Sequence, residues 1–285
     1  MKDKPNQASQ VSQEITTKSG SNFSLSFFFL PKEKREAITH FYALSRLIDD
    51  AVDDYVGQEA KDHLNFWKKE IELCYQGKPS HPVSLGMQKA AQDFKIPQNY
   101  LDLLIEGCEM DLSKKRYETY EDLQAYCYRV AGVVGLTCMK IFGLDSQEAQ
   151  ASARELGLAL QLTNILRDVA EDAKIGRLYI PIQDIKRYGL KEEQVLKGPI
   201  NPKLKILFKL MHDRAQTNFD RAFSKMQQLP KKPLLAAWIM GKVYQRILTK
   251  IKEKDFDIYQ GKISLNKAEK AWIAMKEYLS QLTTS

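Results

Sequence analysis

The sequence has few cysteines, and their arrangement excludes a disulfide framework. Cys74, Cys108, Cys127 and Cys138 form no CxxC pair and stand in apolar or helical surroundings, so we expect reduced thiols in a cytoplasmic protein. The four histidines are equally scattered and form no spaced pair. A zinc site built on histidine or cysteine is therefore excluded.

Long apolar runs are also missing. No window approaches the roughly 18 consecutive apolar residues of a membrane-spanning helix, and residues 1–20 lack the apolar segment of a secretory signal, so we expect them to form a polar, mobile tail. Glycine (14 residues) and proline (10) are thinly scattered, which argues against a turn-rich β-sandwich. The 44% of hydrophobic residues is enough for a sizeable core.

The charge is positive: 43 Lys and Arg against 36 Asp and Glu give +7. Such a balance suits an anionic partner, which can be nucleic acid, an acidic membrane face or a phosphorylated substrate. The lysines are dispersed and form no nucleic-acid-binding motif, so we expect no nucleic-acid partner. The stretch 238–254 combines an apolar with a basic face, which leaves open peripheral contact with the inner face of a membrane.

Apolar residues recur at helical spacing from Pro31 onward, and we find no repeat and no interdomain linker. Residues 21–285 are therefore predicted to form one all-α domain. Residues 173–190 break the helical period and are predicted to be a non-helical, functional connection. The expected helices are 32–54, 58–76, 82–93, 97–113, 119–143, 146–171, 201–228, 231–254 and 264–282.

A first acidic cluster lies in 49–54, where four of the six residues are aspartates. At about 100° per residue, Asp49 and Asp53 lie one turn apart on the side that also carries Tyr42 and Arg46. Like charges at this spacing destabilise a helix by roughly 0.2–0.5 kcal/mol. A solvated acidic face is the ordinary explanation, but the apolar residues between the aspartates favour a side that faces a polar cavity.

A second polar stripe lies in 161–172. Gln161, Asn164, Asp168 and Asp172 share one side of a helix that is apolar before them, at 156–160. Polar groups are costly in a core unless they bind something. We therefore favour a binding function over an ordinary surface helix.

Two carboxylate stripes without histidine or cysteine favour a hard cation. Oxygen ligands suit Mg²⁺, with Mn²⁺ as the alternative, and Mg²⁺ is often shared between carboxylates and substrate phosphates. Arg46, Arg167 and Arg177 stand beside the stripes, and guanidinium groups match phosphate oxygens. The pattern indicates a diphosphate held through Mg²⁺, which turns a poor leaving group into a good one.

Departure of a diphosphate from an allylic chain leaves a carbocation, which needs a dry pocket with aromatic faces. Tyr42 and Tyr126 are candidates for those faces. Gly132 and Gly135 stand within a predicted helix, where glycine costs up to about 1 kcal/mol relative to alanine. They serve either close helix packing or a slot for an isoprenoid chain.

Taken together, these residues resemble the squalene/phytoene synthase family, whose members join prenyl diphosphates head to head. The resemblance runs from about Phe23 to Leu279 and rests on three motifs, which are Tyr42–Asp53, Tyr126–Gly132 and Gln161–Asp172 with the following Gly176–Pro181. Glu109–Leu112, Arg177–Tyr179 and the C-terminal run look most like the branch that makes presqualene diphosphate for bacterial hopanoids. A basic residue common in the family is absent from 19–23.

The resemblance implies an isoprenoid-synthase helical bundle around a central cavity, acting on two molecules of farnesyl diphosphate. Asp49, Asp53 and Asp168 would act in catalysis with Tyr42 and Tyr126. Proton loss to the released diphosphate or through Tyr126 would close the cyclopropane. The implied Mg²⁺ ligands are Asp49, Asp53, Asn164, Asp168 and Asp172, and the implied substrate-binding residues are Phe23, Arg46, Val134, Gly135, Gln161, Asn164, Arg167 and Arg177.

Three alternatives stay open within the family. Squalene synthesis would add reduction by NADPH, whereas phytoene or dehydrosqualene synthesis would use related substrates, and pocket depth would set the chain length. Interaction with the isoprenoid enzymes that use the product also stays open. A terpene cyclase is less consistent, because Ser or Thr and Glu usually stand where this chain has Asp168 and Asp172.

Overall fold

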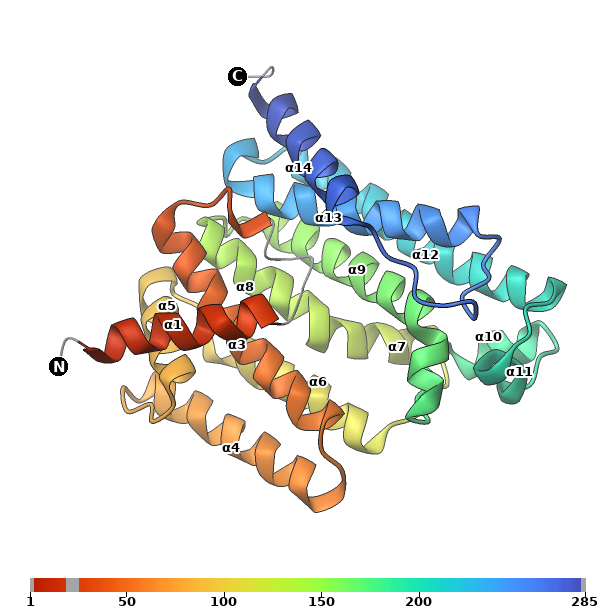
Figure 1. Cartoon of the computed structure of the whole chain (residues 1–285), viewed down its shortest axis with the longest axis horizontal. Coiled ribbons are helices and arrows are strands. Elements are labelled where there is room, and N and C mark those ends of the chain that lie inside the picture. Colours follow the sequence, from red (N-terminus) through yellow and green to blue (C-terminus); the bar gives the residue numbers. More distant parts are fainter. Residues whose placement is uncertain (1–2, 19–25, 283–285) are drawn as a thin grey trace.

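The computed structural model describes residues 3–18 and 26–282, and these residues are mostly helical (Figure 1). In the described part, the β-structure is limited to a single bridge between Arg116 and Leu178. The helices are α1 (Asp3–Lys18), α3 (Lys32–Asp53), α4 (Gly57–Tyr75), α5 (Pro82–Phe94), α6 (Gln98–Ser113), α7 (Tyr120–Cys127), the π-helical turn η1 (Tyr128–Gly132), α8 (Val133–Phe142), α9 (Gln147–Lys174), α10 (Ile182–Arg187), α11 (Glu192–Lys197), α12 (Pro202–Met226), α13 (Lys231–Glu253) and α14 (Lys267–Leu282).

The long helix α9 is the centre of the bundle. It packs against α12, α13, η1 and α8, while α3 packs against α1, α4, α5 and α6 on the other side of the molecule. Figure 1 shows α3 and α9 on opposite sides of α8. The acidic end of α3 and the polar stripe of α9 are thus held by two separate groups of helices.

Local sequence explains where the helices begin and end. Thr119 and Asp122 form a capping box at the start of α7. The Asn201 side chain caps α12, and Pro202 occupies its first turn, where a missing N–H costs nothing. Gly143 ends α8 with φ 78°, a conformation that glycine adopts without strain.

One helical stretch, Tyr120–Phe142, is long and apolar enough by composition to span a membrane. Half of its apolar window is buried inside the molecule. This is the pattern of a core helix in a compact bundle, and α6 and α9 are the helices that cover it.

The expectation of a polar, mobile N-terminal tail is wrong for residues 3–18, which form α1. Small residues spaced four apart, Ala8, Ser12 and Thr16, give this polar segment a narrow buried face. That face packs on α3 and α5, and Ser12 Oγ lies 2.9 Å from Nδ1 of His40. The contact depends on small size and not on hydrophobicity, so composition did not show it.

Residues 173–190 are not wholly non-helical, which is a second correction. α9 continues to Lys174, and Ile182–Arg187 forms the short helix α10 directly after Pro181. Proline is well suited to a helix start because its φ is already helical. The non-helical part is the stretch between them, which carries Arg177.

The stretch 238–254 does not present a free apolar face, which is a third correction. Ile239, Val243, Ile247 and Ile251 of α13 are buried against neighbouring helices. The ring of Trp238 stacks on Phe223 of α12, with centroids 4.9 Å apart. The apolar side of α13 is therefore part of the core.

Candidate active site

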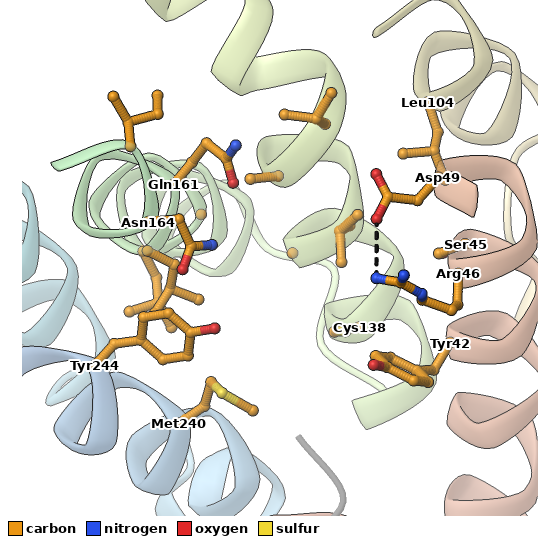
Figure 2. Close-up of a pocket in the computed structure, with 18 of the residues that line it drawn as sticks. Tyr42, Ser45, Arg46, Asp49, Leu104, Cys138, Gln161, Asn164, Met240 and Tyr244 are labelled. Carbon is orange, nitrogen blue, oxygen red and sulfur yellow. Dashed lines mark hydrogen bonds and ion pairs between the residues drawn. The ribbon is translucent and has the colours of Figure 1, made fainter. Parts of the chain in front are cut away.

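A cavity of about 720 Å³ opens between α3, α6, α8, α9 and α13 (Figure 2). Figure 2 shows Tyr42, Arg46 and Asp49 of α3 facing Gln161 and Asn164 of α9 across it. Phe23 lies outside the described residues. Gly132 does not line this cavity. The other residues predicted for catalysis or binding do: Tyr42, Arg46, Asp49, Asp53, Tyr126, Val134, Gly135, Gln161, Asn164, Arg167, Asp168, Asp172 and Arg177.

One end of the cavity is polar and the rest is apolar. The apolar lining comes from η1, α8, α9, α13, the N-terminal half of α3 and the segment before α3. It includes Phe27, Ile38, Phe41, Val130, Val134, Met139, Phe142, Leu156, Leu160, Ala237 and Met240. Such a pocket suits a ligand with a charged head and a long hydrocarbon chain.

On α3, Arg46 holds the first acidic face. Its Nη1 donates to Oδ2 of Asp49 at 3.3 Å, and its Nη2 pairs with Asp50. The cavity walls withdraw Asp49 from bulk water, and together with the nearby charge of Asp53 this raises the pKa of Asp49 to about 7. The acidic face of α3 thus carries more negative charge than Arg46 neutralises.

On α9, Arg167 pairs with Asp168, donating from Nε to Oδ1 at 2.8 Å. Loss of hydration and the charge of Asp168 raise the pKa of Asp172 to about 7. Asn164 Oδ1 is buried at the cavity wall and accepts no hydrogen bond from the described residues. A buried acceptor without a donor is costly, so this oxygen is ready for a ligand.

Arg177 connects the two acidic faces. It comes from the turn after α9, yet its Nη1 donates to Oδ1 of Asp53 at 2.7 Å and its Nη2 donates to the carbonyl oxygen of Val52 at 3.1 Å. The sequence placed Arg177 beside the second stripe only. The contact with Asp53 brings the C-terminal end of α3 to the C-terminal end of α9.

A buried carboxylate, Asp111 of α6, lies at the same end of the cavity. Its Oδ2 accepts a hydrogen bond from the Tyr126 hydroxyl at 2.9 Å, and its Oδ1 accepts one from the Tyr179 hydroxyl at 2.8 Å. The rings of Tyr126 and Tyr179 stack with centroids 5.2 Å apart. Sequence reasoning used Asp111 only as part of a resemblance and assigned it no role.

A signal for Asp111 was present in the sequence. Leu104, Cys108 and Asp111 follow one another at helical spacing on the apolar side of α6. A lone carboxylate on such a face is buried and needs donors, and the two tyrosines supply them. Tyr244, Lys262 and Lys270 also line the cavity and were not predicted.

The environment of Tyr126 restricts what it can do. Burial and the neighbouring Asp111 hold the pKa of this phenol well above its usual value, so it remains protonated. It can move a proton only by passing its own to Asp111 while accepting another. Tyr42 faces the cavity from α3, with its ring edge-on to Phe27 at 6.2 Å.

Two glycines let helices approach closely around the apolar part. A Cβ at Gly157 of α9 would lie 2.6 Å from the carbonyl oxygen of Ala131 in η1, and a Cβ at Gly135 of α8 would lie 2.7 Å from that of Ala153. Both glycines also line the cavity. Close packing and a slot beside the cavity are therefore two results of the same contact.

The donor set is consistent with Mg²⁺. All the candidate ligands offer oxygen, and the buried Asn164 oxygen lacks a partner among the described residues. Burial and neighbouring carboxylates raise the pKa values of Asp49 and Asp172. Among the described residues, no three His, Cys, Asp or Glu side chains converge closely enough to hold an ion by themselves.

The fold and the site define a helical protein whose cavity has charged residues at one end and an apolar interior. The family model of squalene/phytoene synthases matches residues 16–269. The chain belongs to this family, whose members are prenyltransferases that join prenyl diphosphates head to head.

Several relatives match most of the chain. It is 31% identical over 267 residues to the 15-cis-phytoene synthase of Synechococcus elongatus, which covers 89% of this chain and 87% of that protein. It is 32% identical over 281 residues to the phytoene synthase of Mycobacterium bovis, covering 97% and 92%.

Solved structures show the same fold. A dehydrosqualene synthase superposes with a TM-score of 0.87 at 25% identity, covering 100% of this chain and 99% of that one. The squalene synthase HpnC from Alicyclobacillus acidocaldarius superposes with a TM-score of 0.81 at 26% identity, covering 88% and 95%. The predicted all-α, isoprenoid-synthase fold is confirmed.

Proposed function

We propose that this protein condenses two molecules of farnesyl diphosphate head to head into presqualene diphosphate, with Mg²⁺, and releases one diphosphate. The observation that carries the proposal is the polar end of the cavity, where two carboxylate faces and three arginines surround a space that continues into an apolar interior. Phosphates and prenyl chains thus have separate, adjoining places.

The residues divide the work by chemistry. Asp49, Asp53, Asn164, Asp168 and Asp172 would hold Mg²⁺, which withdraws electrons from the diphosphate and makes it a better leaving group. Without a ligand, Arg46, Arg167 and Arg177 pair with carboxylates of these faces. When the carboxylates turn to the cation, the guanidinium groups are available for phosphate oxygens.

The carbon chemistry takes place in the apolar part. The C1–O bond of one farnesyl diphosphate breaks, and the bonding electron pair leaves with the diphosphate. The 2,3 double bond of the second molecule attacks C1 of the resulting cation, and loss of a proton closes the cyclopropane. Tyr42 lines the cavity opposite α9, Tyr126 lines it where its hydroxyl donates to Asp111, and the apolar walls exclude water.

A second candidate is the same condensation on two C20 diphosphates. The names of the phytoene synthases among the relatives favour it. Chain length depends on the apolar part of the cavity, which the rings of Phe27, Phe41 and Phe142 line. Because these bulky rings shorten the available space, we favour the C15 substrate.

The product identifies the function. The purified protein is incubated with farnesyl diphosphate and Mg²⁺, with and without NADPH, and the products are dephosphorylated and analysed by mass spectrometry. We expect presqualene alcohol in both reactions. Squalene formed only with NADPH would show the reducing enzyme, and turnover only with a C20 diphosphate would show the second candidate.

Replacing Phe142 should lengthen the cavity. Phe142 lies far from the first acidic face. Its carbonyl oxygen accepts a hydrogen bond from Lys34 of α3 at 2.7 Å, and Lys34 precedes Asp49 by fifteen residues, which is about 22 Å along the helix at 1.5 Å per residue. Phe142→Val is therefore expected to raise the share of C20 turnover when C15 and C20 diphosphates compete. The control is Phe219→Val in α12, because Phe219 is also buried but does not line the cavity. An unchanged ratio of C20 to C15 turnover in Phe142→Val would refute the chain-length argument.

Turnover should rise with pH through about 7. Asp49 and Asp172 have pKa values raised to about 7, by loss of hydration and by Asp53, Asp111 and Asp168, against the opposing effect of Arg46 and Arg177. Protonated carboxylates do not bind Mg²⁺, so kcat/KM is expected to fall below pH 7 and to level off above it. More Mg²⁺ should move the midpoint to lower pH, because the ion binds only the deprotonated form. A pH profile at two Mg²⁺ concentrations checks both points, and a midpoint independent of Mg²⁺ would contradict the ligand assignment.

A further inference from the structure

Helix α14 carries apolar side chains on its outer face. Its inner side is marked by the buried Ala274, which is 2% exposed. Trp272, Met275 and Leu279 are 70%, 54% and 51% exposed, and their spacing of three and four residues places them on one stripe. A surface helix normally turns its charged side outward, so this orientation needs an explanation.

A second segment extends the apolar stripe. Phe28, in the turn before α3, is 74% exposed. The adjacent Phe29 packs its ring on Tyr278 of α14, with centroids 5.5 Å apart. We call the resulting patch the α14 surface; it consists of Phe28, Trp272, Met275, Tyr278 and Leu279. Exposed apolar patches formed by separate segments mark interaction sites more often than single exposed side chains do.

The charges around the α14 surface are mainly positive. Lys276 is exposed beside the stripe, and Lys267 is exposed at the first residue of α14, two turns before Ala274. Glu269 is turned back toward α13, where it accepts a hydrogen bond from Lys250 at 2.9 Å, and Glu277 is half-buried. The outward charge agrees with the net charge of +7 and favours an anionic partner.

The α14 surface lies next to the cavity. Lys270, two residues before Trp272, lines the cavity, and so does Phe27, which precedes Phe28. Both segments that form the surface therefore also form the cavity wall. An apolar chain leaving the cavity between them would reach the α14 surface directly.

We propose that the α14 surface docks on an anionic lipid bilayer, with Trp272, Met275, Leu279 and Phe28 among the headgroups, Lys276 against anionic phosphates and Lys267 adding positive charge at the start of the helix. A second copy of this chain is disfavoured, because two copies carry the same net charge of +7 and repel each other. The docking goes beyond the proposed function; only its use, delivery of a prenyl product into lipid, rests on that function.

Vesicle binding of the full chain tests the proposal. The protein is mixed with phosphatidylcholine vesicles with or without phosphatidylglycerol and then sedimented. We expect it to bind the vesicles that contain phosphatidylglycerol and to be released by salt. Tryptophan emission should shift to the blue on binding, because Trp67 is buried and Trp238 is stacked on Phe223, which leaves Trp272 as the exposed reporter.

Two sets of variants locate the contact. The triple variant Trp272→Ser, Met275→Ser, Leu279→Ser is expected to weaken binding at least tenfold, and Lys267→Glu with Lys276→Glu should remove the preference for phosphatidylglycerol. Matched controls come from α4, which lies at the opposite edge of the molecule (Figure 1). They are Phe66→Ser and Lys61→Glu with Lys69→Glu, at exposed positions, and they should bind as the unmodified protein does.

Three results would overturn the proposal. These are no binding to either vesicle, equal loss of binding in the α4 controls, and a dimer in sedimentation equilibrium that the triple variant dissolves. Sedimentation with vesicles requires no turnover, so it can succeed if the proposed reaction is wrong and fail if that reaction is right.

Discussion

Replacing Asp53 or Asp168 with asparagine is expected to lower kcat/KM by roughly 100-fold or more while leaving the protein folded. Each substitution removes a negative charge at the polar end of the cavity and keeps the size of the side chain. Neither residue is buried in the core, so little packing is lost. The ion pair between Asp53 and Arg177 is partly exposed, and such pairs contribute at most about 1 kcal/mol.

The control for this prediction is Asp54→Asn. Asp54 is exposed at the end of α3, beside Asp53, and does not line the cavity. It should keep normal turnover, and all three variants should show the circular dichroism and melting temperature of the unmodified protein. Normal turnover in Asp53→Asn or Asp168→Asn, or an equal loss in Asp54→Asn, would show that the acidic faces do not bind the reacting diphosphate.

Gly157→Ala is expected to destabilise the protein and to reduce turnover. The added methyl group would lie 2.6 Å from the carbonyl oxygen and 2.8 Å from the carbonyl carbon of Ala131, and a backbone group cannot rotate away as a side chain can. α9 must therefore move away from η1. Overpacking of this kind costs about 1–3 kcal/mol, against a gain of up to about 1 kcal/mol from helix propensity.

The loss of turnover follows from the position of Gly157. Gln161, Asn164 and Asp168 follow it on the same side of α9, so a displaced helix carries them away from α3. Thermal melting and steady-state kinetics check the two effects, and Gly135→Ala, which meets the Ala153 carbonyl in the same way, should behave alike. An unchanged melting temperature in both variants would contradict the close approach of α8 and η1 to α9.

The helical fold could be predicted because apolar spacing and turn residues mark most helices locally. The long helix α9 and the capped start of α12 are examples. α1 could not be predicted, since its buried face consists of small and polar side chains such as Ser12, whose partner His40 is distant in sequence. The π-helical turn Tyr128–Gly132 was equally hidden: it lies within the single helix predicted for 119–143, next to Gly157 of α9.

The candidate site was predictable where its residues repeat along one helix. Asp49 with Asp53, and Asn164 with Asp168, belong to such stripes. Contacts between stripes were not predictable: Arg177 reaches Asp53 across 124 positions, and Asp111 depends on hydroxyl groups from two other segments. Helical spacing gives the face on which a side chain lies, but not the face that it meets.

The central claim is that the two acidic faces bind a diphosphate head group jointly through Mg²⁺. Titration calorimetry with inorganic diphosphate, in the presence and absence of Mg²⁺, measures this without any turnover. We expect tight binding only with Mg²⁺, and strong loss of that binding in both Asp53→Asn on α3 and Asp168→Asn on α9. Binding that is equally tight without Mg²⁺, or that survives both substitutions, would contradict the account.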